Sequence, residues 1–227
     1  MVTTAAPRKV TLSFDNGPTQ GVTDQVLDLL ADRGLLALFF PIAQKLAEPS
    51  ARAVMERAVR EGHRVGNHSL THGAPLGDIS ASEATVEIGK AQEILADLAD
   101  PARWIRPWGT DGELNQRCLS PAAVEYLVAG GYTCVLWNSV PHDWEDPSGW
   151  VDVALLDVRG RGHTLIVLHD LPTGAMDELP RFLDELRNAN VTITQDLPAS
   201  CLPIVNGELV ASVRHLVAGG GWQAGSP

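Results

Sequence analysis

The chain has 227 residues, of which 44% are hydrophobic and 20% are charged, as is typical of a globular protein with a sizeable core. Its formal net charge of -11 argues against a nucleic acid as partner, because phosphate binding needs a basic face. No apolar run is long enough to span a bilayer, so we expect no membrane partner either.

Short apolar runs at regular intervals predict β-strands. The run at residues 9–14 places Val10, Leu12 and Phe14 on one face of an extended strand. The run at residues 35–42 is apolar throughout, which is typical of a strand buried on both faces. Further strands are expected at residues 64–66, 104–105, 133–137, 164–168 and 191–194.

Amphipathic stretches between these runs predict helices. Ser80 and Glu83 form a capping box, and Ser120 is a good N-cap for the helix that follows it. The expected helices cover residues 23–33, 52–61, 80–98, 120–130, 150–158 and 176–188. Near the end, Asn206-Gly207 between two apolar runs predicts a hairpin over 203–210, and residues 219–227 are expected to fray.

Roughly seven strands that alternate with helices predict a parallel sheet with right-handed crossovers. We predict a single α/β domain over residues 1–227, in which 197–227 form a C-terminal hairpin and tail. The fold class that we favour is a distorted (β/α) barrel of about seven parallel strands, with the active site at their C-terminal ends. An open, doubly wound sheet is the alternative. The barrel is favoured because almost every residue that could act as a catalytic group or a metal ligand directly follows a predicted strand. Barrel enzymes place their active sites at these positions.

Two of the polar motifs that follow predicted strands lie in the first third of the chain. Asp15 and Asn16 follow the first strand directly and precede a Gly-Pro turn. His68 and His72 are spaced i, i+4, so a helical turn would let both imidazoles reach one metal ion. Each motif taken alone also fits an ordinary structural role.

Three further motifs follow later strands. Arg106 precedes Trp108 and Gly109, and its guanidinium can hold a carboxylate in a fixed direction. His169 ends the strand predicted at 164–168 and can act as a general acid if a carboxylate orients its ring. Asp143, which Trp144 follows, is the candidate for this carboxylate, and Asp170 is its competitor.

Taken together in this order, the five motifs resemble the polysaccharide deacetylase family with its NodB-type domain, also called carbohydrate esterase family 4. The family pattern runs Asp-Asp-Gly-Pro, His-(Ser/Thr)-x-x-His, Arg-Pro-Pro-Tyr, Asp-Trp and Leu-His. The resemblance covers residues 9–196. It implies a divalent metal, zinc before cobalt or nickel, held by His68, His72 and Asn16.

The resemblance also implies the catalytic roles. Asp15 would be the general base that activates a metal-bound water, and Arg106 would keep Asp15 ionised and oriented. His169 would protonate the leaving amine, with Asp143 holding its ring. The implied substrate contacts are Trp144, beside His169, and the segment of Trp108 and Gly109, where a backbone N–H could stabilise the oxyanion.

Two departures from the family pattern bear on function. Asn16 stands where the family has a metal-binding Asp, and a neutral amide oxygen should weaken metal binding. The third motif is one residue shorter than usual, with Trp108 at or near the aromatic position, which could reshape the oxyanion pocket.

Three functions remain open on the sequence. The first is a metal-dependent hydrolase that removes acetyl groups from an N-acetylated or O-acetylated sugar or a related small amide. The second is an allantoinase-like hydrolase of a cyclic amide, ureide or imide, possibly without a metal. The third is a relative that binds carbohydrate without cleaving it. The partner in each case is a small molecule or carbohydrate, and the oligomeric state is open.

The first residues lack the apolar segment of a signal peptide, which predicts a cytoplasmic protein. A secreted form shortened at its N-terminus would look the same.

Overall fold

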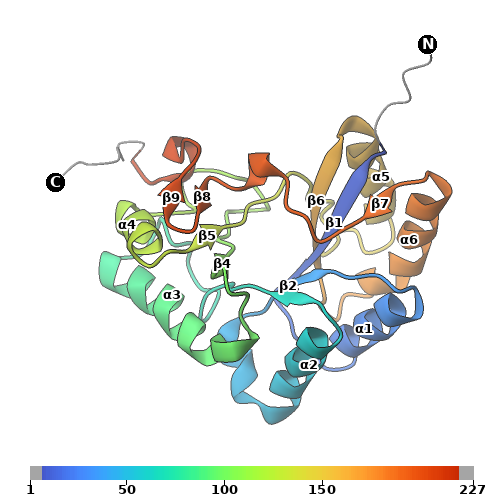
Figure 1. The fold of residues 1–227 in the computed structure, drawn as a ribbon, viewed down its shortest axis with the longest axis horizontal. Helices are drawn as coiled ribbons and strands as arrows, with labels where there is room; N and C mark the ends of the chain where they lie inside the picture. Colours follow the sequence, from blue (N-terminus) through green and yellow to red (C-terminus); the bar gives the residue numbers. More distant parts are fainter. Residues whose placement is uncertain (1–6, 220–227) are drawn as a thin grey trace.

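Strand β1 is the centre of the larger of two sheets in the computed structural model, which describes residues 7–219 (Figure 1). The strand order is β3-β2-β1-β6, and β7 pairs with the first residues of β1. All these pairs are parallel. The bounds are β1 (Lys9–Asp15), β2 (Leu38–Phe40), β3 (Arg64–Val65), β6 (His163–His169) and β7 (Thr192–Ile193).

The smaller sheet contains two parallel strands and a C-terminal hairpin. Its order is β4-β5-β8-β9, with β8 antiparallel to both of its neighbours. The bounds are β4 (Trp104–Ile105), β5 (Thr133–Cys134), β8 (Ile204–Val205) and β9 (Glu208–Leu209). Single bridges, Asn67 to Ile105 and Ser139 to Ile166, connect this sheet to the larger one. Within residues 7–219 the parallel strands are thus β1 to β7, and the predicted distorted barrel is confirmed.

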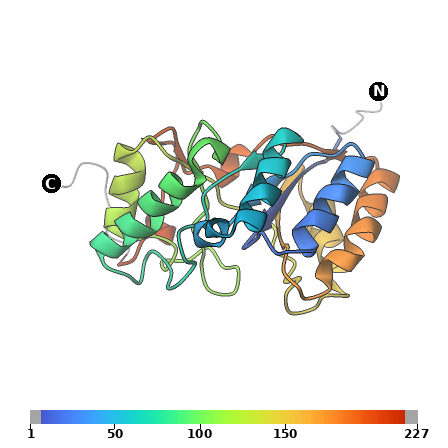
Figure 2. The ribbon, with the colours of Figure 1, turned by 90° about the horizontal axis from the view of Figure 1, so that it is seen from below.

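Helices cover the outside of the strands. Figure 2 shows them in a row, from α4 through α3, α2 and α1 to α6. The bounds are α1 (Val22–Asp32), α2 (Pro49–Arg60), α3 (Ala81–Leu95), α4 (Pro121–Ala129), α5 (Trp150–Gly160) and α6 (Leu179–Asn188). Short 3-10 helices are η1 (Ala43–Ala47), η2 (Ala96–Leu98), η3 (Ala175–Glu178), η4 (Ala199–Cys201) and η5 (Arg214–Leu216). The capping box of Ser80 and Glu83 opens α3 as predicted, and Ser120 caps α4.

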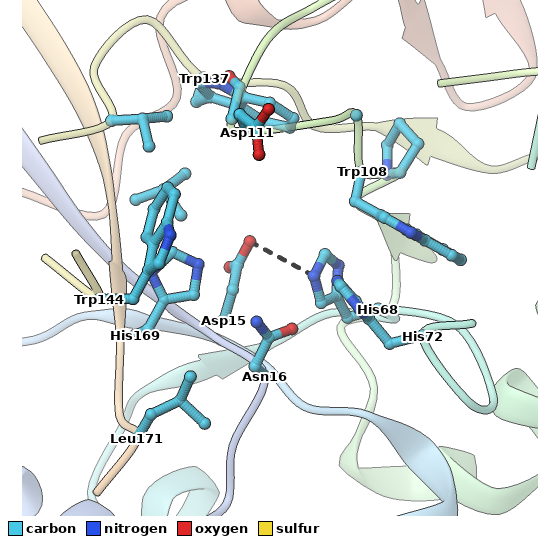
Figure 3. Close-up of a pocket in the computed structure, with 15 residues that line it drawn as sticks. Asp15, Asn16, His68, His72, Trp108, Asp111, Trp137, Trp144, His169 and Leu171 are labelled. Atoms are coloured by element: carbon cyan, nitrogen blue, oxygen red, sulfur yellow. Dashed lines mark hydrogen bonds and ion pairs between the residues drawn. The ribbon is translucent and has the colours of Figure 1, made fainter. Parts of the chain in front are cut away.

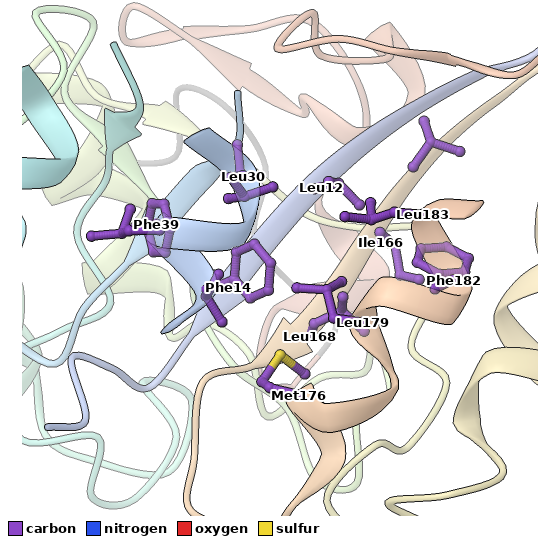
Figure 4. Close-up of a cluster of buried hydrophobic side chains, with 14 of the residues drawn as sticks. Leu12, Phe14, Leu30, Phe39, Ile166, Leu168, Met176, Leu179, Phe182 and Leu183 are labelled. Atoms are coloured by element: carbon purple, nitrogen blue, oxygen red, sulfur yellow. The ribbon is translucent and has the colours of Figure 1, made fainter. Parts of the chain in front are cut away.

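Alternation along β1 separates a hydrophobic face from a polar one. Val10, Leu12 and Phe14 join the core under the outer helices, as predicted (Figure 4). Phe14 stacks on Phe39 of β2 with ring centres 5.2 Å apart. Burial of each such side chain stabilises the fold by about 1.5–3 kcal/mol. The other face of β1 carries Ser13 and Asp15, so the period of two directs polar groups towards the barrel interior.

Some predicted boundaries are wrong. The strand expected at 35–42 is limited to Leu38–Phe40, and Leu36 is exposed. The strand expected at 133–137 ends at Cys134: Val135 N–H still donates to Ile105 of β4, but Leu136 N–H donates to Cys201 in η4. Apolar character alone does not show where a ladder breaks.

Three further predictions concern the chain ends, the domain organisation and the membrane. Residues 1–6 and 220–227 lie outside the described part, and with them most of the tail predicted at 219–227. The predicted single-domain organisation stays a prediction. Each helix found between residues 7 and 219 is too short or too polar to cross a membrane.

Candidate active site

A cavity of about 300 Å³ opens at the carboxyl ends of β1 and β6 (Figure 3). The parallel register of these strands places their last residues, Asp15 and His169, opposite each other. Most of the predicted site residues line the cavity, namely Asp15, Asn16, His68, His72, Trp108, Gly109, Trp144 and His169. The remaining two, Arg106 and Asp143, lie behind this lining and are fully buried.

Asp15 forms a buried ion pair with Arg106. One guanidinium nitrogen, Nη1, donates to Asp15 Oδ1 at 2.7 Å and to Ser13 Oγ at 2.7 Å. The guanidinium carbon also lies 4.0 Å from the centre of the Phe40 ring. Water screens this pair weakly, because the two side chains are only 5% and 0% exposed. The pair fixes the direction of the carboxylate and leaves its Oδ2 3.6 Å from His68 Nε2.

His68 and His72 lie next to each other, with ring centres 4.8 Å apart. His68 Nδ1 is 2.8 Å from the carbonyl oxygen of Arg106. Because a carbonyl only accepts, Nδ1 carries the proton and Nε2 keeps its lone pair. Burial lowers the pKa of His68 to about 3, and burial with the charge of neighbouring His68 lowers the pKa of His72 to about 3. Both rings are neutral near pH 7, the form that binds a metal.

The segment that joins the two histidines is not the helical turn that their spacing predicts. Ser69 and His72 have left-handed backbone, with φ of 67° and 53°. Asn67 Oδ1 accepts the N–H of Ser69 at 2.8 Å, and a carboxylate oxygen of Glu87 accepts the N–H of Leu70 at 3.1 Å. Side chains thus satisfy backbone donors that a helix would have paired internally. The two rings still meet, on a loop instead of a helix face.

The side chain of Asn16 lies in a position suited to a metal ligand. Its backbone is left-handed, with φ of 72°. Its N–H donates to the carbonyl of Phe40 at 3.2 Å, and Lys45 Nζ donates to its carbonyl at 2.7 Å. The side-chain oxygen Oδ1 is buried and has no hydrogen-bond partner within the described residues. Figure 3 shows this side chain beside Asp15 and His68.

His169 stands on the opposite side of the cavity from the histidine pair. Its Nδ1 is 2.8 Å from Asp143 Oδ1, and its backbone N–H donates to Asp143 Oδ2 at 2.8 Å. Burial alone would lower the pKa of His169, but the hydrogen bond and charge of Asp143, helped by Asp15 and Asp170, outweigh burial and raise it. Trp144 packs edge-on against the ring at 4.8 Å.

The alternative prediction, that Asp170 is the carboxylate that orients His169, is wrong. Its carboxylate accepts a hydrogen bond from the hydroxyl of Thr23. The backbone reverses the side-chain direction between successive residues of a strand, so His169 and Asp170 leave β6 on different sides.

The shortened third motif places Trp108 against the histidine pair. The indole is 8% exposed and stacks on His72, with ring centres 4.6 Å apart and an angle of 21° between the planes. Gly109 follows where a Cβ atom would overlap the backbone carbonyl of Glu113. The predicted oxyanion contact of this segment stays a prediction.

Seven residues that we did not predict as part of the site also line the cavity, and they are Pro107, Asp111, Gly112, Trp137, Val140, Val167 and Leu171. Trp137 is anchored by a hydrogen bond from its Nε1 to the carbonyl of Gly112 at 2.9 Å. Val140 and Leu171 lie close in sequence to Asp143 and His169, and that proximity is the only signal the sequence carries for them.

A comparison with protein families decides where the chain belongs. The model described as polysaccharide deacetylase matches residues 3–122, which is more than half of the chain. The chain belongs to the polysaccharide deacetylase family. Membership confirms the resemblance drawn from the five motifs, and it supports the prediction of a hydrolase of this type.

Curated relatives carry the same family activity in their names. The chain is 30% identical over 171 residues to a chitooligosaccharide deacetylase of Sinorhizobium fredii, covering 74% of each protein. It is 28% identical over 191 residues to the peptidoglycan-N-acetylmuramic acid deacetylase PdaC of Bacillus subtilis. That match covers 82% of this chain but only 38% of PdaC, so the chain spans well under half of that relative.

Solved structures of this polysaccharide deacetylase family share the fold. A family 4 carbohydrate esterase from Streptomyces lividans, in complex with acetate, has a TM-score of 0.70 and 25% identity, with 91% of this chain and 99% of that one covered. A family 4 acetyl xylan esterase from Clostridium thermocellum, in complex with a cobalt ion, has a TM-score of 0.67 and 25% identity. That match covers 82% of this chain and 87% of the esterase.

The residues of this family member fit a divalent metal. Two neutral imidazoles and one buried, unpaired amide oxygen face the same cavity, from His68, His72 and Asn16. No group of three or more His, Cys, Asp or Glu side chains suited to a metal occurs between residues 7 and 219. The set of His68, His72 and Asn16 is not such a group, because its third donor is an asparagine.

Proposed function

We propose that the chain is a metal-dependent hydrolase that removes acetyl groups from an N-acetylated sugar. The observation that carries this proposal is the placement of three different chemical groups around one cavity. These are a carboxylate paired with a buried guanidinium, two neutral histidines beside a free amide oxygen, and a third histidine paired with Asp143. The family membership and the names of the relatives support the same reaction.

The ion that we propose is zinc, held by His68, His72 and Asn16, because imidazole nitrogen with an oxygen donor suits zinc. When bound, zinc would polarise the acetyl carbonyl and make water more acidic. Asn16 brings no negative charge, so we expect weaker binding than a carboxylate would provide. Cobalt and nickel fit the same donors.

The proposed proton transfers use the two sides of the cavity. Asp15 Oδ2 accepts the proton of the attacking water, since Arg106 occupies Oδ1 and keeps the carboxylate oriented. His169 donates a proton from Nε2 to the leaving nitrogen, because Asp143 occupies Nδ1 and favours the protonated ring. Trp144 limits the movement of that ring from the side.

The cavity lining favours a neutral sugar. Among the described residues, no Lys or Arg side chain lines the cavity, whereas Asp15 and Asp111 do. Trp108, Trp137 and Trp144 supply aromatic surface, which suits the apolar face of a sugar ring. An anionic sugar would meet the Asp111 carboxylate without a Lys or Arg side chain in the lining to compensate. We therefore propose N-acetylglucosamine oligomers as substrates in preference to glycans that carry muramic acid.

The test begins with chelator-treated protein that is reloaded with zinc, cobalt or nickel. We expect one ion per chain and acetate release from N-acetylglucosamine oligomers. In the His68→Ala variant both should disappear, whereas the exposed His215→Ala should keep both as a control. Turnover of allantoin or cyclic imides without turnover of sugars would establish the ring-opening alternative. Sugar binding without any turnover would establish the non-catalytic one.

Asp111→Asn tests the choice of substrate. We expect the ratio of rates on neutral oligomers and on muramic acid glycans to fall by about three- to tenfold, because removal of one repulsive charge is worth roughly 1 kcal/mol at such a site. Steady-state kcat/KM on both substrates measures it. An unchanged ratio would contradict the role of Asp111.

The cytoplasmic location also stays a prediction, which fractionation of the native protein tests.

A further inference from the structure

Asp170 is a buried carboxylate for which the proposed reaction has no use. It is 1% exposed, and one of its oxygens, Oδ1, has no hydrogen-bond partner within the described residues. A buried and incompletely satisfied carboxylate destabilises a protein unless its surroundings compensate. Burial raises the pKa of Asp170 to about 6, against the opposing hydrogen bond from Thr23. Such a group calls for an explanation.

The carboxylate of Asp170 lies directly against the turn that follows Asn16. A Cβ atom at Gly17 would overlap both oxygens of this carboxylate, so only glycine allows so close an approach. On the other side of the turn, Ile42 N–H donates to the carbonyl of Gly17 at 3.1 Å. The backbone of residue 17 is therefore enclosed between β6 and the segment after β2.

A short chain of hydrogen bonds extends this contact to the far end of the turn. The hydroxyl of Thr23, in the first turn of α1, donates to Asp170 Oδ2. The same hydroxyl oxygen accepts the N–H of Thr19 at 2.7 Å. Thr23 is fully buried, so water does not compete for these bonds. Asp170 thus links the end of β6, the turn and α1.

This arrangement acts on Asn16, whose backbone, like that of His72, is left-handed. The left-handed φ of Asn16 costs a non-glycine residue free energy and persists only where its surroundings impose it. Lys45 holds the carbonyl of Asn16, and Asp170 with Thr23 holds the residues that follow. The left-handed backbone is what presents the amide oxygen to the cavity next to the histidines.

We propose that Asp170, through Gly17 and Thr23, is a positioning residue that holds the Asn16 amide oxygen towards His68 and His72. This inference rests on the proposed metal site but not on the identity of the substrate. It assigns to Asp170 a role in metal affinity, separate from the pairing of His169 with Asp143. Placement of the carboxylate, rather than its charge, carries the effect.

The measurement is cobalt affinity of the whole chain, by competition with a chelator, together with the visible spectrum of bound cobalt. We expect Asp170→Ala to weaken cobalt binding about tenfold, as loss of an outer partner of a metal ligand does, and to change the spectrum. Asp170→Asn, which keeps the shape and can still accept from Thr23, should restore most of the affinity. Thr23→Val should weaken binding in the same direction by a smaller factor.

A double-mutant cycle separates positioning from general stability. In an Asn16→Ala background, the Asp170→Ala substitution should have no further effect on cobalt affinity, because the oxygen that it positions is gone. The control is Asp100→Asn, which removes another buried carboxylate, one paired with Arg64 and outside the cavity lining. It should leave cobalt affinity unchanged even where the melting temperature falls.

Three outcomes would overturn the inference. They are wild-type cobalt affinity in Asp170→Ala, an equal loss in the Asp100→Asn control, or an additive loss in the Asn16→Ala background. If Asp170→Ala does not fold, Thr23→Val with the same cycle decides. A failure to deacetylate sugars would contradict the proposed function but would leave these binding results valid.

Discussion

The two sides of the cavity use the same residue type in opposite ways. On one side, burial lowers the pKa of His68 and of His72 to about 3. On the other side His169 is also largely buried, but the hydrogen bond and charge of Asp143 outweigh burial and raise its pKa. These shifts fit the proposed roles, in which the first two rings give a lone pair to a metal ion and the third gives a proton.

The difference shows that a carboxylate at Nδ1, rather than burial, separates the two directions of the pKa shift. His68 Nδ1 meets a backbone carbonyl, which orients the ring without bringing a full negative charge. His169 Nδ1 meets Asp143, which orients the ring and also stabilises its positive form. The proposed role of each imidazole, ligand or acid, thus follows from the group behind it.

The largest expected effect is that of His169→Ala, on the acid side of the cavity. We expect kcat for deacetylation to fall by about 10²- to 10⁴-fold, the usual contribution of a positioned general acid. Cobalt affinity should stay within about twofold of the wild type, because His169 does not belong to the proposed donors. Steady-state kinetics and a chelator titration measure the two quantities. A loss of cobalt binding comparable to that in His68→Ala would show that the two sides are not separate.

In Asp143→Asn, we expect the pKa of His169 to fall towards the low values of His68 and His72. Without the charge of Asp143 the pKa of His169 falls, so the protonated form is lost at lower pH than in the wild type. The alkaline limb of the kcat/KM profile should therefore move to lower pH, by about one to three units. Asp152→Asn, on the exposed face of α5, serves as the control. An alkaline limb that stays in place would mean that His169 is not the group that titrates there.

The smallest of these effects is expected for Trp108→Ala, on the metal affinity of the histidine pair. The indole is stacked on His72 and limits the rotation of that ring. Trp108→Ala should weaken cobalt binding by up to about tenfold, the lower end of the loss caused by removal of a group that supports a ligand. Trp108→Phe should keep most of the affinity because it keeps the stack. Equal affinity in the Ala variant and the wild type would show that the indole serves another purpose.

Much of the site could be predicted because its residues follow strands. Alternation in residues 9–14 already separates Leu12 and Phe14 from Ser13 and Asp15, and the structure places the two sets on opposite faces. The helical turn predicted between His68 and His72 was wrong, because Asn67 and Glu87 satisfy the backbone there. Local spacing does not show which distant side chains will compete for backbone donors.

Residue types and their spacing were enough to predict the alternation of strands and helices, the order of the five motifs and the family to which they point. These features depend on residue type and on short-range periodicity. The three-dimensional fold brings Asp143 rather than Asp170 to His169, stacks Trp108 on His72, and joins Arg106 to Asp15 from 91 residues away. It also decided the opposite pKa shifts of the histidines. Those depend on burial and on charges from distant segments, which no local pattern encodes.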